Sequence, residues 1–96
     1  MIGFLPMLLV LLIDGCGEAP HLRGVAHYHD QCSICHGHDT VAHARRTLKL
    51  DGSRVTVSRS GKLLDEFLLT HGRASKRERE GLVALFTRLL REGEAQ

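Results

Sequence analysis

The chain has 96 residues, with 13 Lys and Arg against 11 Asp and Glu, and a formal net charge of +2. This length suffices for one small domain, and the weak, mixed charge does not favour nucleic-acid binding. Only 4% of the residues are aromatic and none is Trp. The chain therefore supplies little bulk for its own core, which a bound cofactor or metal would help to complete.

Residues 1–13 form an uncharged and almost wholly apolar run, which is followed by Asp14, Gly15 and Cys16. A run of this length is short for a membrane span and is typical of the hydrophobic region of an export signal. With Ile13 and Gly15, its end resembles a bacterial lipobox, in which the cysteine is lipidated and becomes the new N-terminus. Asp14 is unusual for that pattern and no Lys or Arg precedes the run. An uncleaved anchor or a buried N-terminal helix therefore stays open.

Cysteine usage supports export with lipidation. Three cysteines cannot all pair, and Cys32 and Cys35 belong to one motif, so Cys16 is left as a lone thiol suited to acylation in an oxidising compartment. We predict a protein anchored by lipid on Cys16 at the periplasmic side of a bacterial membrane, or otherwise a soluble periplasmic protein. The predicted division is an export signal at 1–15, a tether at 16–20 and one folded domain at 21–96.

The first predicted helix covers about 21–35, and Pro20 is well placed for its first turn. Gly24, Tyr28 and Cys32 recur every fourth residue and therefore share one face of this helix. A small residue, an aromatic residue and a cysteine on one stripe predict that another helix crosses closely at Gly24.

A loop and a hairpin are predicted next. Residues 37–46 show no sustained period, which is typical of a loop. The following segment alternates on both sides of Asp51-Gly52, a strong hairpin signal. We predict two strands at about 47–50 and 54–58. The residues expected to face each other across the hairpin are Leu48, Leu50, Val55 and Val57.

Two further helices are predicted in the second half of the chain. The first covers about 62–71 and stops at Gly72, a favoured residue after a helix end, so His71 is expected at the end of this helix. The second begins at the capping box formed by residues 75–78 and continues to about Arg91. The apolar faces are formed by Leu63, Leu64, Phe67 and Leu68 in the first helix and by Leu82, Leu85, Phe86, Leu89 and Leu90 in the second.

The stretch CSICH at residues 32–36 is the strongest chemical motif of the chain. In C-x-x-C-H each cysteine thiol forms a thioether with one vinyl group of a haem, and the histidine ligates the iron. Zinc needs a second pair of ligands; His38 and His43 could be recruited, but no second C-x-x-C is present. A thioredoxin-like dithiol expects a βαβ context, which this chain lacks. We therefore predict one covalent haem c per chain. Its protein ligands would be Cys32, Cys35 and His36, the last as the proximal iron ligand.

The motif and the residues before it resemble a small, single-haem, class I-like c-type cytochrome. In that family a glycine eight residues and an aromatic four residues before the first haem cysteine pack against the C-terminal helix. Gly24 and Tyr28 stand at these offsets from Cys32. The resemblance covers residues 21–36 closely and 60–92 in outline. It implies a mainly α fold with cytochrome c-like helices around one covalent haem, to which this chain adds a small β-hairpin.

The resembled family usually provides a methionine as the distal iron ligand, and this chain departs from that pattern. Its only methionines, Met1 and Met7, lie in the leader. In the family the distal ligand comes from the region just before the last helix, and we therefore predict His71 as the distal ligand. His43 is the alternative, and a surface position for His71 would leave an open or externally ligated iron. The histidines not favoured as ligands are His21, His27, His29 and His38, and of these His27 and His29 are expected to face solvent or to pack.

A covalent haem with two histidine ligands in so small a domain leaves no space for a substrate pocket. We therefore predict a one-electron transfer protein and not an enzyme, with redox proteins as partners and no nucleic acid. The basic residues that could steer an acidic partner are Arg45, Arg46, Lys49, Arg73 and Lys76. Two alternatives stay open: a gas-binding or gas-sensing haem module with an open distal site, and a haem subunit of a larger periplasmic oxidoreductase.

Overall fold

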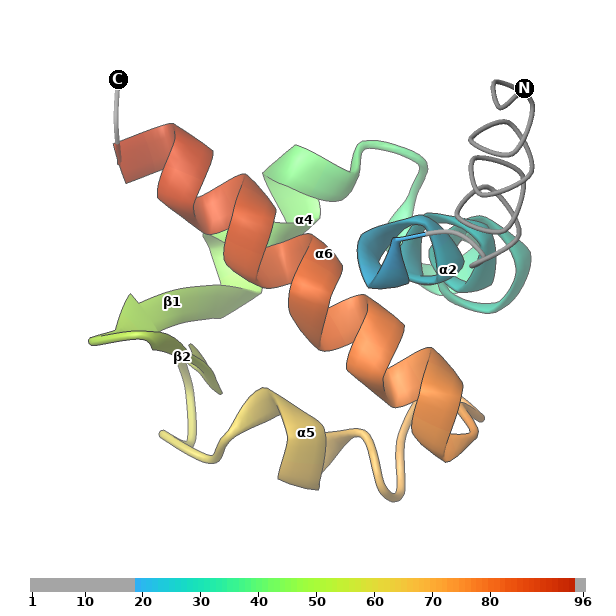
Figure 1. Cartoon of the computed structure of the whole chain (residues 1–96). Coiled ribbons are helices and arrows are strands. Elements are labelled where there is room, and N and C mark those ends of the chain that lie inside the picture. Colours follow the sequence, from blue (N-terminus) through green and yellow to red (C-terminus); the bar gives the residue numbers. More distant parts are fainter. Residues whose placement is uncertain (1–18, 95–96) are drawn as a thin grey trace, which may run out of the picture.

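The computed structural model describes residues 19–94, and in this part the chain is mainly helical with a single two-stranded antiparallel sheet (Figure 1). The predicted mainly α fold with a small hairpin is thus confirmed. The predicted export signal, the Cys16 lipid site and most of the tether lie outside the described residues. In chain order the elements are α2 (Pro20–His27), the wider helical turn η1 (Tyr28–Cys32), α3 (Ser33–His36), α4 (Thr40–Thr47), β1 (Leu48–Asp51), β2 (Arg54–Val57), α5 (Leu64–Phe67) and α6 (Lys76–Glu94).

The first helical segment begins at Pro20 and includes α2, η1 and α3 without a break. It matches the helix predicted over about 21–35, except that its middle is a π-helical turn. In this turn the Ser33 amide donates to the Tyr28 carbonyl, five residues back, and Ser33 Oγ donates to the His29 carbonyl at 2.7 Å. Such turns are frequent at functional sites, and this one ends at the first cysteine of the motif.

The close helix crossing predicted at Gly24 is confirmed, and its partner is Gly81 of α6. A Cβ on Gly24 would overlap the Gly81 carbonyl oxygen and lie 2.6 Å from the carbonyl carbon. A Cβ on Gly81 would lie 2.8 Å from the Gly24 nitrogen. The two helix backbones therefore touch, which only a glycine on each side permits.

The loop predicted over residues 37–46 is wrong, because α4 occupies most of it. Asp39 caps this helix, with its Oδ1 accepting a hydrogen bond from the Ala42 amide at 3.0 Å. A capping carboxylate satisfies an amide that has no partner within the helix. Only Ala44 of α4 is buried, so the helix contributes little to the core, and its capping residue Asp39 was the start signal that was missed in the sequence.

The predicted hairpin is confirmed, with the two strands shifted by about one residue from the predicted bounds. Leu48 pairs with Val57 and Leu50 with Val55. Gly52 has φ 68° in the connecting turn, the left-handed backbone that the tight hairpin turn requires. The hairpin therefore places Leu48 and Val55 in the core, where both are buried.

The helix predicted over 62–71 is wrong in length. α5 is a single turn, after which the chain bends and leaves His71 exposed rather than at a helix end. Leu64 and Leu68 are buried, whereas Leu69 is 62% exposed. The apolar face that suggested a longer helix therefore ends at Leu68.

The connection from α5 to α6 is set by two residues and a capping box. Gly72 has φ 91° and Arg73 has φ 51°, a left-handed backbone that no right-handed helix continues. The capping box is confirmed: the Glu78 amide donates to Ser75 Oγ at 3.2 Å, and the Ser75 amide donates to Glu78 Oε1 at 2.9 Å. α6 therefore starts where the sequence predicted.

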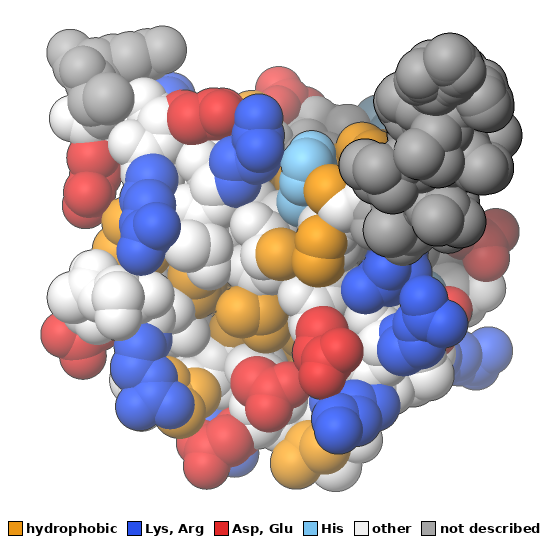
Figure 2. All heavy atoms as spheres, in the orientation of Figure 1, with side chains coloured by type: hydrophobic (Ala, Val, Ile, Leu, Met, Phe, Trp, Pro, Cys, Tyr) orange, Lys and Arg blue, Asp and Glu red, His pale blue; other side chains and the backbone are white. Residues whose placement is uncertain are grey.

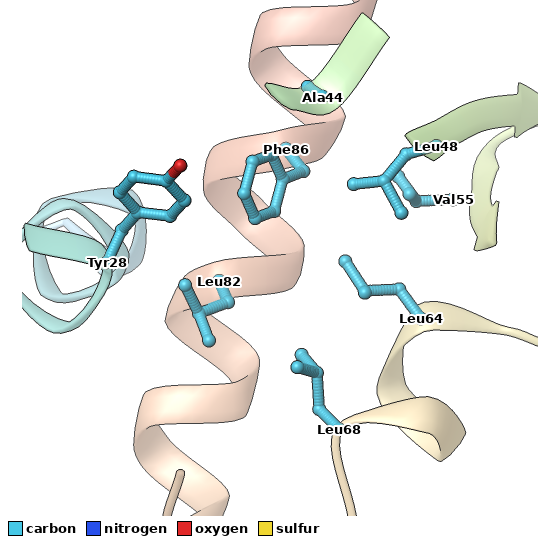
Figure 3. Close-up of a cluster of buried hydrophobic side chains, with 8 residues drawn as sticks. All are labelled: Tyr28, Ala44, Leu48, Val55, Leu64, Leu68, Leu82 and Phe86. Carbon is cyan, nitrogen blue, oxygen red and sulfur yellow. The ribbon is translucent and has the colours of Figure 1, made fainter. Parts of the chain in front are cut away.

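The core lies along the inner face of α6, which runs diagonally past the other elements in Figure 1. Tyr28 approaches from the first helical segment, and its ring meets the Phe86 ring edge to face, with centres 6.1 Å apart. Figure 3 shows the buried apolar side chains, which converge from six elements and from the residue that follows α5: Tyr28, Ala44, Leu48, Val55, Leu64, Leu68, Leu82 and Phe86. The core thus joins the motif-bearing helix to α5, α4 and the hairpin.

Candidate functional site

The motif lies at the junction of η1 and α3. Cys32 ends η1 and is half-buried, whereas Cys35 on α3 is exposed, and neither thiol is in a disulfide. Ile34 between them is 83% exposed. Burial raises the pKa of the Cys32 thiol above its ordinary value. Two free thiols three residues apart are thus available to a ligand that approaches from the surface.

Three histidines from separate segments meet beside the motif. The ring of His36, on α3, lies with its centre 4.3 Å from that of His43 on α4 and 6.1 Å from that of His71 in the bend after α5. Phe67 packs against His71, with the two ring centres 4.6 Å apart. The structure therefore brings the predicted proximal residue, the predicted distal residue and the alternative distal residue together.

The ring separations distinguish the two candidate partners of His36. An imidazole nitrogen binds a metal at about 2 Å and lies about 1.1 Å from its own ring centre, so imidazoles on opposite sides of one metal have ring centres about 6 Å apart. His36 and His71 have this separation, at 6.1 Å. His43, at 4.3 Å, is too close to His36 to occupy the opposite side of the same ion without moving. The geometry favours His71.

His43 is a half-buried, neutral neighbour of this pair. Burial is the largest cause that lowers its pKa from 6.5 to about 4, followed by the charges of His36, Arg46 and His71. Its ring also packs against Tyr28, with ring centres 5.8 Å apart. Its Nδ1 is buried and has no hydrogen-bond partner within the described residues. In the part of the chain that the structure describes, His43 therefore carries a buried ring nitrogen without a hydrogen-bond partner, beside two other histidines and Arg46.

The other histidines are not part of this group, and one of them, His27, makes a contact that the sequence did not predict. The rings of His29 and His38 stack with centres 6.1 Å apart, and both residues are exposed. His27 was expected to face solvent or to pack; it is only 6% exposed, and its Nε2 lies 2.8 Å from the Gly72 carbonyl oxygen. No pattern in the sequence singled out this contact, because it joins residues 45 positions apart.

Charged side chains of both signs cover the face over α6. Figure 2 shows Lys and Arg interspersed with Asp and Glu, with apolar side chains between them. The five basic residues proposed to steer a partner are all exposed: Arg45, Arg46, Lys49, Arg73 and Lys76. Two surface pockets lie along α6 beside Pro20 and Ala84, and neither is lined by a residue of the C-x-x-C-H motif.

The residues of the site fit the two axial positions of a haem iron. Within residues 19–94, no group of three or more His, Cys, Asp or Glu side chains is arranged to hold a metal ion. A haem iron needs only two axial ligands from the protein, since the porphyrin provides the other four. A ring pair at 6.1 Å, two thiols spaced as C-x-x-C and a proximal histidine next to the second thiol match that requirement.

Comparisons with protein families, with curated proteins and with solved structures find no match. Over residues 19–94, no helix is both long enough and apolar enough to cross a membrane.

Proposed function

We propose that this chain is a one-electron transfer protein that carries one covalently attached haem c. Cys32 and Cys35 would form the thioethers, His36 would be the proximal iron ligand and His71 the distal one. The observation that carries the proposal is the 6.1 Å separation of the His36 and His71 rings, because it is the separation that two imidazoles on opposite sides of one metal require. The haem, when bound, supplies one-electron exchange between its ferric and ferrous states.

The chain's own residues have separate tasks in this proposal. The exposed Cys35 and the half-buried Cys32 would hold the haem at the surface end of the first helical segment. Phe67 packs on His71 at 4.6 Å between ring centres and limits the orientations of the distal imidazole. A second histidine in place of methionine lowers the reduction potential, since methionine favours the ferrous state. Exposure at the thioether side lets electrons leave without a substrate pocket.

The dithiol alternative is disfavoured by the environment of Cys32. A thiol that attacks disulfides has a lowered pKa, as at a helix N-terminus or beside a cation. Burial raises the pKa of Cys32 instead, so less of its reactive thiolate is present at neutral pH.

Gas binding is the second candidate function, and the position of His71 is the observation that favours it. His71 is exposed and lies in a bend, not on a helix, so it could stay off the iron and leave the distal site open to a small gas. The two functions differ in the resting state: electron transfer predicts a low-spin ferric protein, and an open gas site predicts a high-spin one. A role as a subunit of a larger periplasmic oxidoreductase would use the same site with a permanent partner.

The test is expression of the full chain with its export signal in a bacterium that attaches haem c. Haem staining of a denaturing gel should label the wild-type band, and the reduced absorption spectrum should show a low-spin c-type haem. Cys35→Ser and Cys32→Ser should each abolish double attachment. Cys16→Ser is the matched control, because it removes the third cysteine and its proposed lipid but should keep the haem. An unstained wild-type band, or staining that survives boiling in the double variant of Cys32 and Cys35, would contradict the proposal.

A further inference from the structure

Two neighbouring residues at the α2–η1 junction bind the carbonyl groups that follow the two candidate iron ligands. Tyr28 donates its hydroxyl to the Gly37 carbonyl oxygen at 2.8 Å, and Gly37 follows His36. His27 places Nε2 at 2.8 Å from the Gly72 carbonyl oxygen, and Gly72 follows His71. Because a carbonyl oxygen only accepts, the Nε2 of His27 must be its protonated, donating nitrogen.

In each contact the donating side chain is buried, whereas the accepting residue is exposed at Gly37 and half-buried at Gly72. Tyr28 is 1% exposed and His27 6% exposed. A buried polar group that loses its partner costs more than the bond itself contributes. Two consecutive residues therefore each hold one glycine carbonyl in place: His27 holds that of Gly72 and Tyr28 holds that of Gly37.

The backbone of the two glycines fits this arrangement. Gly37 has φ 84° and Gly72 has φ 91°, conformations that L side chains rarely adopt. At both positions the chain reverses direction directly after a histidine. The repeated His-Gly pair thus provides a turn whose carbonyl faces back toward the first helical segment.

His27 connects the bend to a third element as well. Its Nδ1 lies 3.6 Å from Glu78 Oε2, and Glu78 belongs to the capping box that begins α6. Two other contacts also hold the bend: Arg79 Nη1 donates to the Ala74 carbonyl at 3.3 Å, and Ala74 packs against the core. His27 adds the hydrogen bond that joins the bend to the first helical segment.

We propose that His27 and Tyr28 are positioning residues that together set the separation of the His36 and His71 rings, Tyr28 acting on the proximal side and His27 on the distal side. The inference rests on the proposed function only in giving that separation a role in iron binding. The pair of hydrogen bonds from His27 and Tyr28, here called the clamp, does not depend on the proposed function and can be tested in the protein with or without haem.

Two amide substitutions of different length at His27 separate its contact with Gly72 from its contact with Glu78. In His27→Gln the side-chain nitrogen reaches about as far as Nε2 and keeps the bond to Gly72. In His27→Asn it reaches only as far as Nδ1, so the Glu78 contact can persist but the Gly72 bond is lost. Tyr28→Phe removes only the hydroxyl on the proximal side and serves as the matched control.

The first measurement is amide hydrogen exchange of the peptides covering residues 69–75 in the purified full chain. Loss of one buried hydrogen bond should speed exchange there about 10-fold in His27→Asn, with His27→Gln close to wild type. Tyr28→Phe should leave residues 69–75 unchanged and loosen the segment after Gly37. Equal exchange in the Asn and Gln variants would overturn the clamp, and this result can be read even in a protein without haem.

The second measurement is the rate at which carbon monoxide binds the reduced holoprotein, where it must replace His71. The rate should rise about 10-fold in His27→Asn and return toward wild type in His27→Gln, in proportion to the opening of the bend. Faster exchange without faster carbon monoxide binding would overturn the positioning role. A wild-type protein without haem would instead overturn the proposed function, and the exchange comparison would still decide whether His27 holds the bend.

Discussion

Gly81→Ala tests the contact on which the whole arrangement depends, the backbone crossing of α2 and α6. The new methyl group would lie 2.8 Å from the Gly24 nitrogen and 2.9 Å from the Pro20 carbonyl oxygen. Ordinary contact begins at about 3.5 Å, so the helices would have to separate by about 0.7 Å. Both neighbours are backbone atoms, which cannot move out of the way alone.

The expected loss of stability follows from two opposing effects. Forcing an extra methyl group into a packed core costs about 1–3 kcal/mol, and a contact with backbone lies at the upper end of that range. Alanine is a better helix former than glycine by about 1 kcal/mol. We therefore expect Gly81→Ala to lower the free energy of unfolding by about 1–2 kcal/mol, which for a domain of this size is about 4–16 °C in Tm.

Gly93→Ala is the matched control, because it places the same methyl group on the same helix. Its nearest neighbour there is Arg45 Nη2 at 3.4 Å, the end of a flexible side chain. Helix propensity should then dominate and stabilise the protein by about 0.5 kcal/mol near the frayed helix end. The assay is urea unfolding followed by circular dichroism at equal haem content. A Gly81→Ala protein as stable as wild type, or shifted in the same direction as Gly93→Ala, would refute the crossing.

Three further predictions concern the ligand histidines and the start of α6. His71→Ala should turn the ferric iron largely high-spin and let carbon monoxide bind the reduced form, whereas His43→Ala should keep the low-spin spectrum; the opposite pattern would exchange their roles. His43 should remain neutral down to about pH 4 when its ring signals are titrated by nuclear magnetic resonance. Since the unfolded chain takes up this proton near pH 6.5, its contribution to stability is complete above that pH and is lost as the pH falls toward 4; a titration midpoint near 6.5 would contradict the burial of His43. Ser75→Ala should lower the free energy of unfolding by about 1 kcal/mol in the same urea assay, through loss of the capping bond, and an unchanged midpoint would show that the cap does not contribute.

The elements predicted correctly are those whose signal is local. Asp51-Gly52 fits only a tight reversal between alternating segments, and Ser75 with Glu78 forms its two capping bonds within four residues. Gly24 was recognised because it shares a helical face with Tyr28. Its partner Gly81 was missed, although a glycine inside an otherwise regular helix pattern indicates a close approach.

The wrong elements are those that tertiary contacts decide. Leu63, Leu64, Phe67 and Leu68 have helical spacing, yet α5 ends after one turn. The bend that follows it has positive φ at Gly72 and Arg73, and its Gly72 carbonyl is bound by His27, 45 residues earlier; no local window contains both partners. At α4 the error was the opposite one, because a loop was predicted where a helix forms. This helix has one buried residue, and Asp39 was not recognised in the sequence as its cap.

The same distinction explains why the sequence could propose His71 but not exclude His43. Both lie within reach of His36 along the chain, and a ranking by position has to assume where the helices lie. The structure brings both rings close to His36, with ring centres 6.1 Å away for His71 and 4.3 Å for His43, and the spectra of His71→Ala and His43→Ala decide between them. One local signal was nevertheless present in the sequence: each of the two favoured ligands is followed directly by glycine, and His43 is followed by Ala44. If each ligand is held through the carbonyl of the residue that follows it, a positive φ at that residue turns the carbonyl toward the first helical segment; Gly37 and Gly72 have this φ, and Ala44, inside α4, does not.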